Sequence, residues 1–201
     1  SELRRVAPRG PYRLGGSSMG GLVAYEMAQQ IVEAGEEVDL LALLDTAAPS
    51  DMPSHPEGDA EILDYLLRGR LPVTLEELSK LSPDEQLSLV LTQARETGAL
   101  PPDLDLDGAR RLVSLVRSHL TALFGYQPRP YPGKVLFFRA GERQAWDAPY
   151  PERAWIELAQ GGIEIQRVPG DHITMHHAPN LPVLVRALTA SLARLPARAG
   201  A

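Results

Sequence analysis

A strand, a helix and a second strand follow one another directly within residues 11–44, and this succession limits the chain to few folds. Residues 11–14 are predicted to form a short strand that runs into two glycines. An apolar-periodic helix follows from about residue 20 to 34, and Gly35 ends it. Residues 38–44 are almost continuously apolar, as in a strand buried on both faces of a parallel sheet. Together these segments form a βαβ unit and predict an α/β fold.

The α/β pattern breaks off at residue 48 and resumes after residue 130. Within the break the sequence predicts three helices. The first spans 59–68, the second begins at the capping box Ser82-Pro83-Asp84-Glu85, and the third spans 107–124; Pro101-Pro102 separates the last two. Beyond the break it predicts strands at 134–139 and 163–168 and helices at 152–159 and 180–193. An insertion of this length is usually a lid or a binding element. We therefore expect a mostly parallel sheet flanked by helices, with residues 48–130 as an inserted helical lid.

The composition excludes several classes of protein. The 201 residues are enough for one α/β domain with a sizeable core. The absence of cysteine excludes disulfides, a thiolate nucleophile and any cysteine-bound metal. A net charge of −6 argues against sequence-independent binding of nucleic acid. No apolar run approaches the roughly 20 residues of a membrane-spanning helix, and residues 1–5 lack the apolar core of a signal peptide. We expect a cytoplasmic protein that binds neither nucleic acid nor membrane.

A candidate nucleophile lies between the first predicted strand and the first predicted helix. Gly16-Ser17-Ser18-Met19-Gly20 matches G-x-S-x-G, with Ser18 as the central serine. The sharp strand-to-helix turn favours small residues two positions before and after the nucleophile, so Ser17, followed by Met19, is the weaker candidate. The N–H of Met19 would face a developing oxyanion at the helix N-terminus. A glycine-rich turn that binds phosphate, or that only packs closely, is the alternative.

A serine nucleophile needs a base and an acid that orients the base. Asp45 ends the second predicted strand and His172 follows the last one, so both are expected at the carboxyl edge of the sheet with Ser18. The order serine, acid, histidine is that of α/β hydrolases. Asp45 could instead be only a turn residue or a helix cap. Asp171 adjoins the histidine and is better explained as a residue that stabilises the loop.

The other histidines fit the active site less well. His55 lies in a proline-rich loop. His119 falls on the apolar stripe of the helix predicted at 107–124, where packing is its expected role; the stripe consists of Leu112, Leu115, Val116, Leu120 and Leu123. His172 and His176 have a helical spacing of four that could suit a metal, but no H-E-x-x-H pattern is present and no metal is expected. The adjacent pair His176-His177 has no evident role.

With the three candidate residues in place, the chain resembles the thioesterase domains that end non-ribosomal peptide and polyketide synthases. The resemblance spans nearly the whole chain, and the spacing of 27 positions from Ser18 to Asp45 is typical of such domains. The similar segments are Gly10-Pro11-Tyr12-Arg13-Leu14-Gly15-Gly16, Gly20-Gly21-Leu22-Val23-Ala24-Tyr25-Glu26, Leu43-Leu44-Asp45-Thr46, Gly170-Asp171-His172-Ile173-Thr174-Met175 and, at the exit of the lid, Tyr126-Gln127-Pro128 and Tyr131-Pro132-Gly133.

The resemblance implies an α/β-hydrolase fold and a serine thioesterase. Ser18 would take an acyl or peptidyl chain from the phosphopantetheine of a carrier domain, expected in the same megasynthase chain, and release it by hydrolysis or macrocyclisation. His172 would be the base, Asp45 would orient it, and the domain itself would bind no cofactor. A stand-alone editing thioesterase, an esterase or lipase, and a non-catalytic α/β-hydrolase-like module that binds an acyl chain are the alternatives.

The segment before Ser18 departs from the pattern of the family. Only 17 residues precede Ser18, so the N-terminal strands of the fold and the loop with the second oxyanion donor are expected to be missing. We expect residues 1–201 alone to be poorly soluble or weakly active until extended upstream by roughly 60–80 residues, sized from the missing strands.

The charge is unevenly distributed along the chain. Residues 51–110 hold 13 acids and 5 bases, whereas residues 111–201 hold 11 bases and 6 acids. We expect an acidic carrier to dock on arginines of the second segment, such as Arg139 or Arg143.

Overall fold

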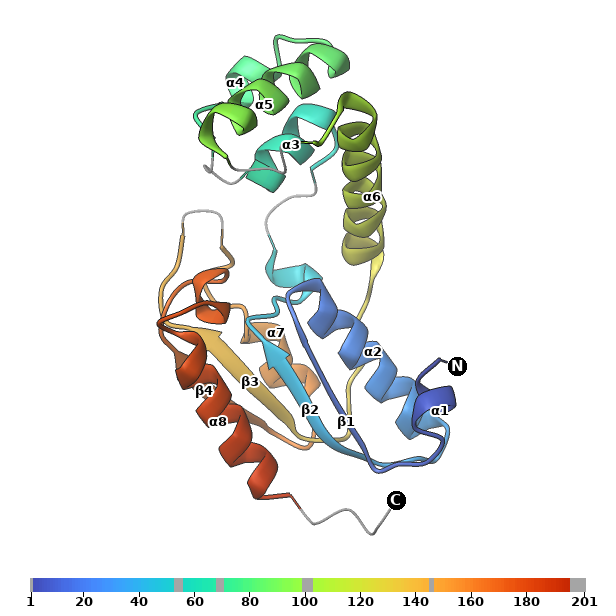
Figure 1. The fold of residues 1–201 in the computed structure, drawn as a ribbon. Helices are drawn as coiled ribbons and strands as arrows, with labels where there is room; N and C mark the ends of the chain where they lie inside the picture. The colour runs from blue at the N-terminus through green and yellow to red at the C-terminus, as the bar shows by residue number, and fades with distance from the viewer. Residues whose placement is uncertain (1, 53–55, 68–70, 99–102, 145–146, 196–201) are drawn as a thin grey trace. The chain divides into compact units, whose positions relative to one another are not determined.

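The computed structural model describes residues 2–52, 56–67, 71–98, 103–144 and 147–195 (Figure 1). The chain divides into two compact units, an α/β unit of Ser1–Pro53 with Gln127–Ala201 and a helical unit of Ser54–Tyr126. The α/β unit contains, in chain order, α1 (Glu2–Val6), β1 (Tyr12–Ser17), α2 (Met19–Glu33), β2 (Val38–Leu44), the 3-10 turn η1 (Pro49–Asp51), β3 (Val135–Ala140), α7 (Arg153–Leu158), β4 (Ile163–Val168), the 3-10 turn η2 (Thr174–His176) and α8 (Leu181–Ala193).

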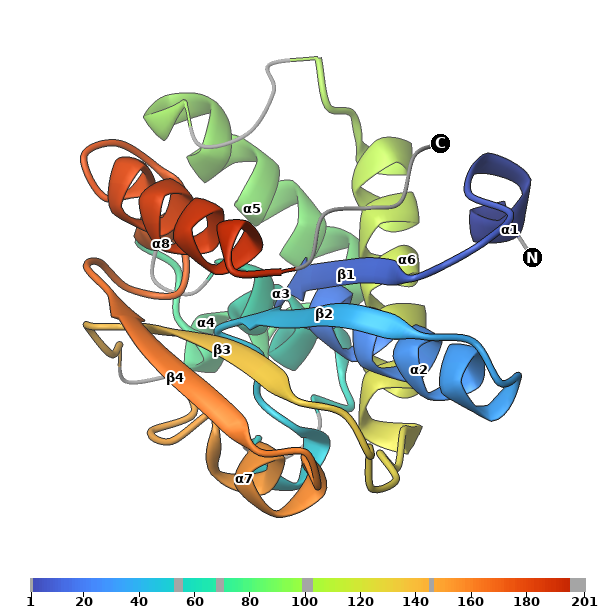
Figure 2. The same ribbon diagram turned by 90° about the horizontal axis from the view of Figure 1, so that it is seen from below.

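The four strands form one parallel sheet in the order β1-β2-β3-β4 (Figure 2). Five of the six residues of β3 are buried, and β2 has Leu41, Ala42 and Leu43 buried and no exposed residue, as expected for the largely apolar central strands of a parallel sheet. Because all the strands are parallel, their carboxyl ends lie at the same edge of the sheet. That edge is the one at which the sequence places its candidate catalytic residues.

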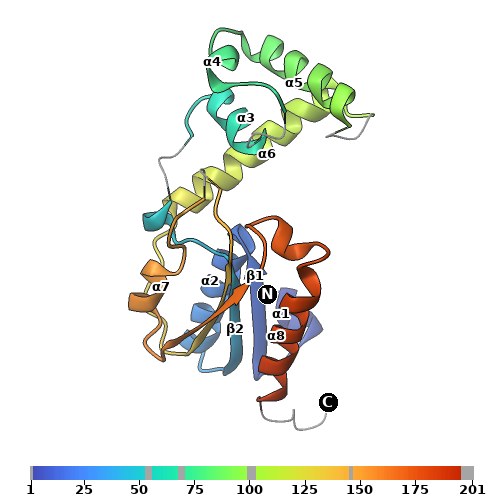
Figure 3. The ribbon, with the colours of Figure 1, turned by 90° about the vertical axis from the view of Figure 1, so that its left-hand side faces the viewer.

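Helices cover both faces of the sheet, with α2 and α7 on one face and α8 on the other (Figure 3). On the α8 side, Phe138 of β3 packs in one cluster with Met175 and Leu184. On the opposite side, the ring centroids of Tyr25 in α2 and Trp155 in α7 lie 4.6 Å apart, and both residues are completely buried. Successive residues of a strand point to opposite faces, so β2 and β3 present side chains to both faces of the sheet.

The predicted elements of the α/β unit agree closely with the observed ones. The predicted strands at 38–44 and 163–168 coincide with β2 and β4, and the boundaries of the other predicted strands and helices differ by one to three residues. Helix α1 and the two 3-10 turns were not predicted, because each is too short to show a period. No helix within the described ranges is long and apolar enough to cross a membrane.

The helical unit contains α3 (Asp59–Leu67), α4 (Leu75–Leu78), α5 (Pro83–Thr97) and α6 (Leu106–Gly125) around an apolar core of its own. The predicted capping box is present at the start of α5, where Ser82 N–H donates to Glu85 Oε2 at 2.8 Å. The last residue of the helix predicted at 59–68 and the Pro101-Pro102 break lie outside the described residues, as does His55.

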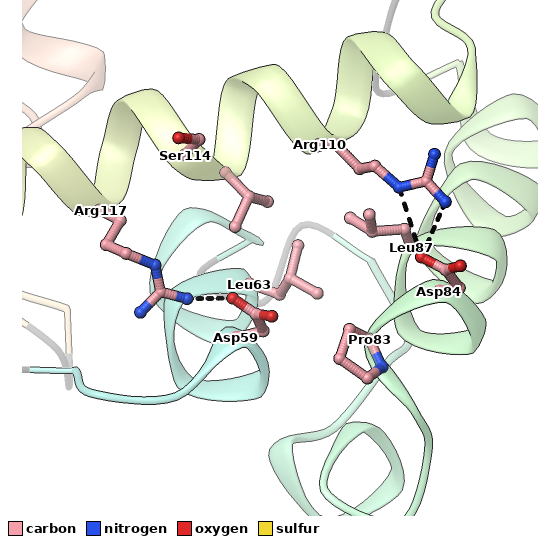
Figure 4. A pocket seen from close by; sticks show the side chains of 9 residues that line it. Asp59, Leu63, Pro83, Asp84, Leu87, Arg110, Ser114 and Arg117 are labelled. Carbon is pink, nitrogen blue, oxygen red and sulfur yellow. Dashed lines mark hydrogen bonds and ion pairs between the residues drawn. The ribbon is translucent and has the colours of Figure 1, made fainter.

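Two pairs of Arg and Asp flank a pocket of about 330 Å³ between α3, α5 and α6 (Figure 4). Arg117 pairs with Asp59, and Arg110 pairs with Asp84. None of the candidate catalytic residues lines this pocket.

The apolar stripe of α6 differs from the predicted one. Leu120 and Leu123 are buried as predicted, but Leu112 and Leu115 are 39% and 52% exposed. His119, which was expected to pack, is exposed. The buried residues of α6 are Ala109, Val113, Leu120 and Leu123. Positions 112, 115 and 119 follow the same three-to-four spacing along an adjacent stripe of the helix, so the spacing alone did not fix which stripe faces the core.

Candidate active site

A candidate residue follows the carboxyl end of each of the four strands. Ser18 directly follows β1 and Asp45 directly follows β2. Arg143 lies three residues beyond β3, and His172 lies four residues beyond β4. The parallel sheet therefore brings to one edge four side chains that are up to 154 positions apart in the sequence.

Ser18 occupies a strained turn between β1 and α2. Its backbone has φ 53° and ψ −127°, a combination that residues other than glycine rarely adopt. The residue is exposed, and Ser18 N–H donates to the carbonyl of Leu44 at 3.2 Å. Met19 begins α2, so its N–H has no carbonyl partner within the helix. This backbone geometry is the one expected of the nucleophile elbow that the sequence predicts.

The glycines around Ser18 have different steric roles. A Cβ on Gly16 would lie 2.1 Å from the carbonyl oxygen of Gly20, so only glycine fits at position 16. The predicted steric requirement at Gly20 itself is wrong, because a Cβ there would meet nothing within 4 Å. The second close approach is at Gly21, where a Cβ would lie 2.0 Å from Thr46 Oγ1. The turn is thus tight on the strand side of Ser18 and against the residue after Asp45.

Asp45 is a fully buried carboxylate with several hydrogen-bond donors. Oδ2 lies 2.8 Å from His172 Nδ1 and 3.0 Å from Arg143 Nη1, while Oδ1 accepts from Ala140 N–H at 3.0 Å and from Arg143 Nη2. Burial would raise the pKa of Asp45, but the hydrogen bonds from His172, Arg143 and Ala140 outweigh it and hold the pKa below its ordinary value. The carboxyl group is therefore ionised near neutral pH.

The contact with Asp45 determines the tautomer of His172. An ionised carboxylate can only accept, so Nδ1 carries the proton and Nε2 of the neutral ring is left as an acceptor. The His172 side chain is 19% exposed. The structure thus joins the candidate acid and base directly; in the described part of the chain no hydrogen bond joins Ser18 to His172.

Asp171 stabilises the loop that carries His172, as predicted. Its Oδ1 accepts from the N–H groups of Ile173 at 3.0 Å and of Thr174 at 2.8 Å, and its Oδ2 accepts from Gln144 Nε2 at 2.9 Å. Hydrogen bonds from the Thr174 backbone and from Gln144 hold the pKa of Asp171 far below its ordinary value. The carboxylate is directed at its own turn.

Three contacts near this edge were not foreseen. Arg143, expected on the surface that binds the carrier, instead pairs with Asp45, and Arg139 pairs with Glu152. Both guanidinium groups already hold carboxylates within the α/β unit, so the structure gives these two arginines a role that the sequence did not predict, and their contact with a carrier stays a prediction. No local pattern in the sequence distinguishes Arg143 from the other arginines, since its partner is 98 residues away.

The third unforeseen contact joins Ser17 to His176. Ser17 Oγ lies 2.9 Å from His176 Nε2. No role for the pair His176-His177 was evident from the sequence, and the structure shows that His176 has a hydrogen-bond partner. Burial lowers the pKa of His176, with smaller contributions from His172 and His177. Among the described residues, no three or more side chains of the metal-binding types gather in one place.

The parallel sheet, the elbow and the carboxylate–histidine pair define a class of α/β proteins, and comparisons with known proteins name it. A family model described as the thioesterase domain matches residues 1–192. The chain belongs to this family, as found in non-ribosomal peptide and polyketide synthases.

The relatives are much longer proteins. The chain is 44% identical over 185 residues to the non-reducing polyketide synthase terA of Aspergillus terreus, covering 90% of this chain and 8% of that protein. The crystal structure of a four-domain nonribosomal peptide synthetase, holo-AB3403, matches with a TM-score of 0.83 and 29% identity over 97% of this chain and 15% of that one. A covalent complex of the NocB thioesterase domain with a fluorophosphonate nocardicin G analogue matches with a TM-score of 0.65 and 26% identity, over 95% and 70% of the two chains. The chain spans between 3% and 10% of the length of the first curated relatives.

Proposed function

We propose that this domain releases an acyl or peptidyl chain from a carrier domain through an ester intermediate on Ser18. The observation that carries the proposal is the contact of 2.8 Å between His172 Nδ1 and Asp45 Oδ2 at the sheet edge where Ser18 occupies its strained turn. In this assignment Ser18 is the nucleophile, His172 the general base and then the general acid, and Asp45 the group that orients the base.

The reaction would proceed in two acyl transfers. Ser18 Oγ attacks the thioester carbonyl while His172 Nε2 takes its proton, and the N–H of Met19 donates to the oxygen that becomes negative. When the C–S bond breaks, His172 returns the proton to the departing phosphopantetheine thiol. Water, or a hydroxyl or amine of the bound chain, then attacks the Ser18 ester while His172 takes its proton, and His172 gives that proton to Ser18 Oγ as the acyl–oxygen bond breaks. Attack by water gives hydrolysis, and attack by a hydroxyl or amine of the bound chain gives macrocyclisation.

Asp45 has an electrostatic as well as an orienting role in this proposal. Its negative charge stabilises the positive charge that His172 gains in each transfer. The bonds from Arg143 and Ala140 favour the ionised form of this buried group, so the carboxylate remains charged when the histidine needs it.

The proposed substrate and partner follow from the family. Relatives of this chain are parts of multidomain synthases, which supports a carrier domain that presents its thioester on phosphopantetheine, with no cofactor held by this domain. Residues 48–130, which include the compact helical unit, are proposed as the lid over the bound chain. An editing thioesterase or an esterase would use the same three residues, and equal turnover of a matched oxygen ester and thioester would favour the esterase.

A fluorophosphonate probe with intact-mass spectrometry tests the nucleophile. We expect one adduct on the unmodified protein, no adduct on Ser18→Ala, and loss of acyl thioester turnover by orders of magnitude in that variant. Ser17→Ala is the comparison variant, because it removes the adjacent hydroxyl but keeps Ser18, and it should still form the adduct, although more slowly. No adduct on the full-length protein would overturn the proposal in favour of a non-catalytic acyl-binding module. An adduct that persists in Ser18→Ala and is lost in Ser17→Ala would show that Ser17, and not Ser18, is the nucleophile.

A further inference from the structure

The hydrogen bond between Ser17 and His176 joins the two segments that carry the proposed nucleophile and base. Ser17 is the last residue of β1 and directly precedes Ser18, and His176 ends η2, four residues after His172. The bond of 2.9 Å therefore spans 159 positions of the sequence at the site itself. It is separate from the contact between His172 and Asp45, which ties the same loop to the end of β2.

The segment between the two histidines is held firmly on its other side. Met175 lies between them in η2, is completely buried and packs in the cluster beneath α8 with Val168 and Leu184. Its N–H donates to the carbonyl of Asp171 at 3.0 Å. The loop is thus anchored to the sheet core through Met175, to β2 through His172 and to β1 through His176. Only the last of these anchors reaches the strand that carries Ser18.

We infer that His176 is a positioning residue for the proposed reaction: by binding Ser17 it fixes the loop of the base His172 relative to the nucleophile elbow at Ser18. The inference rests on the proposed function, because it concerns the geometry of the same two groups. A displacement of about 1 Å between reacting groups can lower a rate by about 10²-fold, so one hydrogen bond at this place has a measurable effect.

The electrostatics of His176 agree with this role. Burial lowers its pKa, the nearby His172 and His177 lower it further, and Asp45 raises it, with a net decrease. Depending on its tautomer, Nε2 of a neutral His176 can accept a hydrogen bond from the Ser17 hydroxyl or donate one to the Ser17 oxygen. A neutral ring also adds no positive charge beside His172, which becomes positively charged during each proposed acyl transfer.

Steady-state turnover of a small acyl thioester of N-acetylcysteamine tests the inference. In His176→Ala we expect kcat to fall by about tenfold to a hundredfold with KM unchanged. His176→Gln should restore most of kcat, because the Gln amide reaches the place of Nε2. Ser17→Ala should lower kcat similarly, and the double variant Ser17→Ala/His176→Ala should be no slower than His176→Ala alone. His177→Ala, which removes the exposed neighbouring ring, is the control and should retain full kcat.

Three results would overturn the inference: an unchanged kcat in His176→Ala, losses that add in the double variant, or an equal loss in His177→Ala. Thermal unfolding of every variant, followed by circular dichroism, identifies any general loss of structure, and Ser17→Ala tests the same bond if His176→Ala is unstable. The proposed function is tested separately by Ser18→Ala. If that variant is inactive while His176→Ala is fully active, the positioning role fails and the proposed function stands.

Discussion

Arg143 donates hydrogen bonds to both carboxylate oxygens of Asp45, whose side chain is completely buried. His172 and the N–H of Ala140 bind the same carboxylate. Asp45 thus connects residues that follow β2, β3 and β4. A buried carboxylate without such partners would be strongly destabilised in its charged form. The proposed acid of the site is therefore also a structural link between three strand ends.

Replacing Arg143 should destabilise the α/β unit. Arg143→Ala removes charge-assisted bonds from a buried carboxylate, and we expect the free energy of unfolding to fall by about 2 kcal/mol, a value typical of hydrogen bonds to charged groups. Urea unfolding measures this difference. Arg153→Ala, at an exposed arginine of α7, is the matched control and should unfold as the unmodified protein does. Equal stability of Arg143→Ala and the control would contradict the structural role.

The lowered pKa of Asp45 predicts a loss of stability in acid. A carboxyl group with a lower pKa in the folded than in the unfolded chain stabilises the fold above its unfolded pKa, which is about 3.9. That contribution is lost as the pH falls through the folded pKa. Free energies of unfolding should therefore decrease more steeply below about pH 4 in the unmodified protein than in Asp45→Asn. Parallel curves for the two proteins would show that Asp45 does not titrate in this way.

The sequence was sufficient for the strands and for the residues that directly follow them. The continuous apolar run of β2 predicted a buried parallel strand, and Asp45 and His172 were then placed at the carboxyl edge by topology alone. Arg143 and His176 could not be found in that way, because their partners are 98 and 159 residues away and no periodicity marks them. Contacts of this kind depend on how strands pair across the sheet.

Short or ambiguous helical patterns account for the other differences. Helix α4 is too short for a hydrophobic period, although Thr74 and Glu77 form a capping box that marks its start. In α6, two adjacent stripes share the same helical spacing, and only packing against α3 and α5 decides which is buried. Propensity and period set the helix in both cases, and tertiary contacts set its orientation.

The backbone strain at Ser18 predicts a stabilising substitution that abolishes activity. A side chain at φ 53° costs about 1–3 kcal/mol, which Ser18→Gly would relieve at the expense of a more flexible unfolded chain. We expect Ser18→Gly to raise the free energy of unfolding by about 1 kcal/mol while turnover disappears. Ser18→Ala keeps the Cβ and should show no such gain. If both variants are equally stable in urea, the turn is not strained at this residue.

Gly16 and Gly20 should respond in opposite ways to alanine. A Cβ on Gly16 would collide with backbone atoms of Gly20, so Gly16→Ala should lower stability by about 2 kcal/mol or more and slow labelling by the fluorophosphonate probe. Gly20 lies in the first turn of α2 and has open space around its Cα, so Gly20→Ala should be neutral or stabilising by up to about 1 kcal/mol. Similar losses in the two variants would show that small residues are needed on both sides of the serine.

Docking of the proposed carrier should depend on arginines that the α/β unit leaves exposed. Arg139 and Arg143 hold carboxylates of their own, whereas Arg153, Arg167 and Arg186 are exposed on α7, β4 and α8. Since complementary charge mainly speeds association, replacing these three with serine should raise KM for a carrier-bound thioester by about tenfold. Turnover of the small N-acetylcysteamine thioester should not change, because that substrate needs no docking surface. Arg5→Ser, at an exposed arginine of α1, serves as the control. An equal loss on both substrates would place the effect in the active site, and unchanged KM for the carrier-bound substrate would place the docking surface elsewhere.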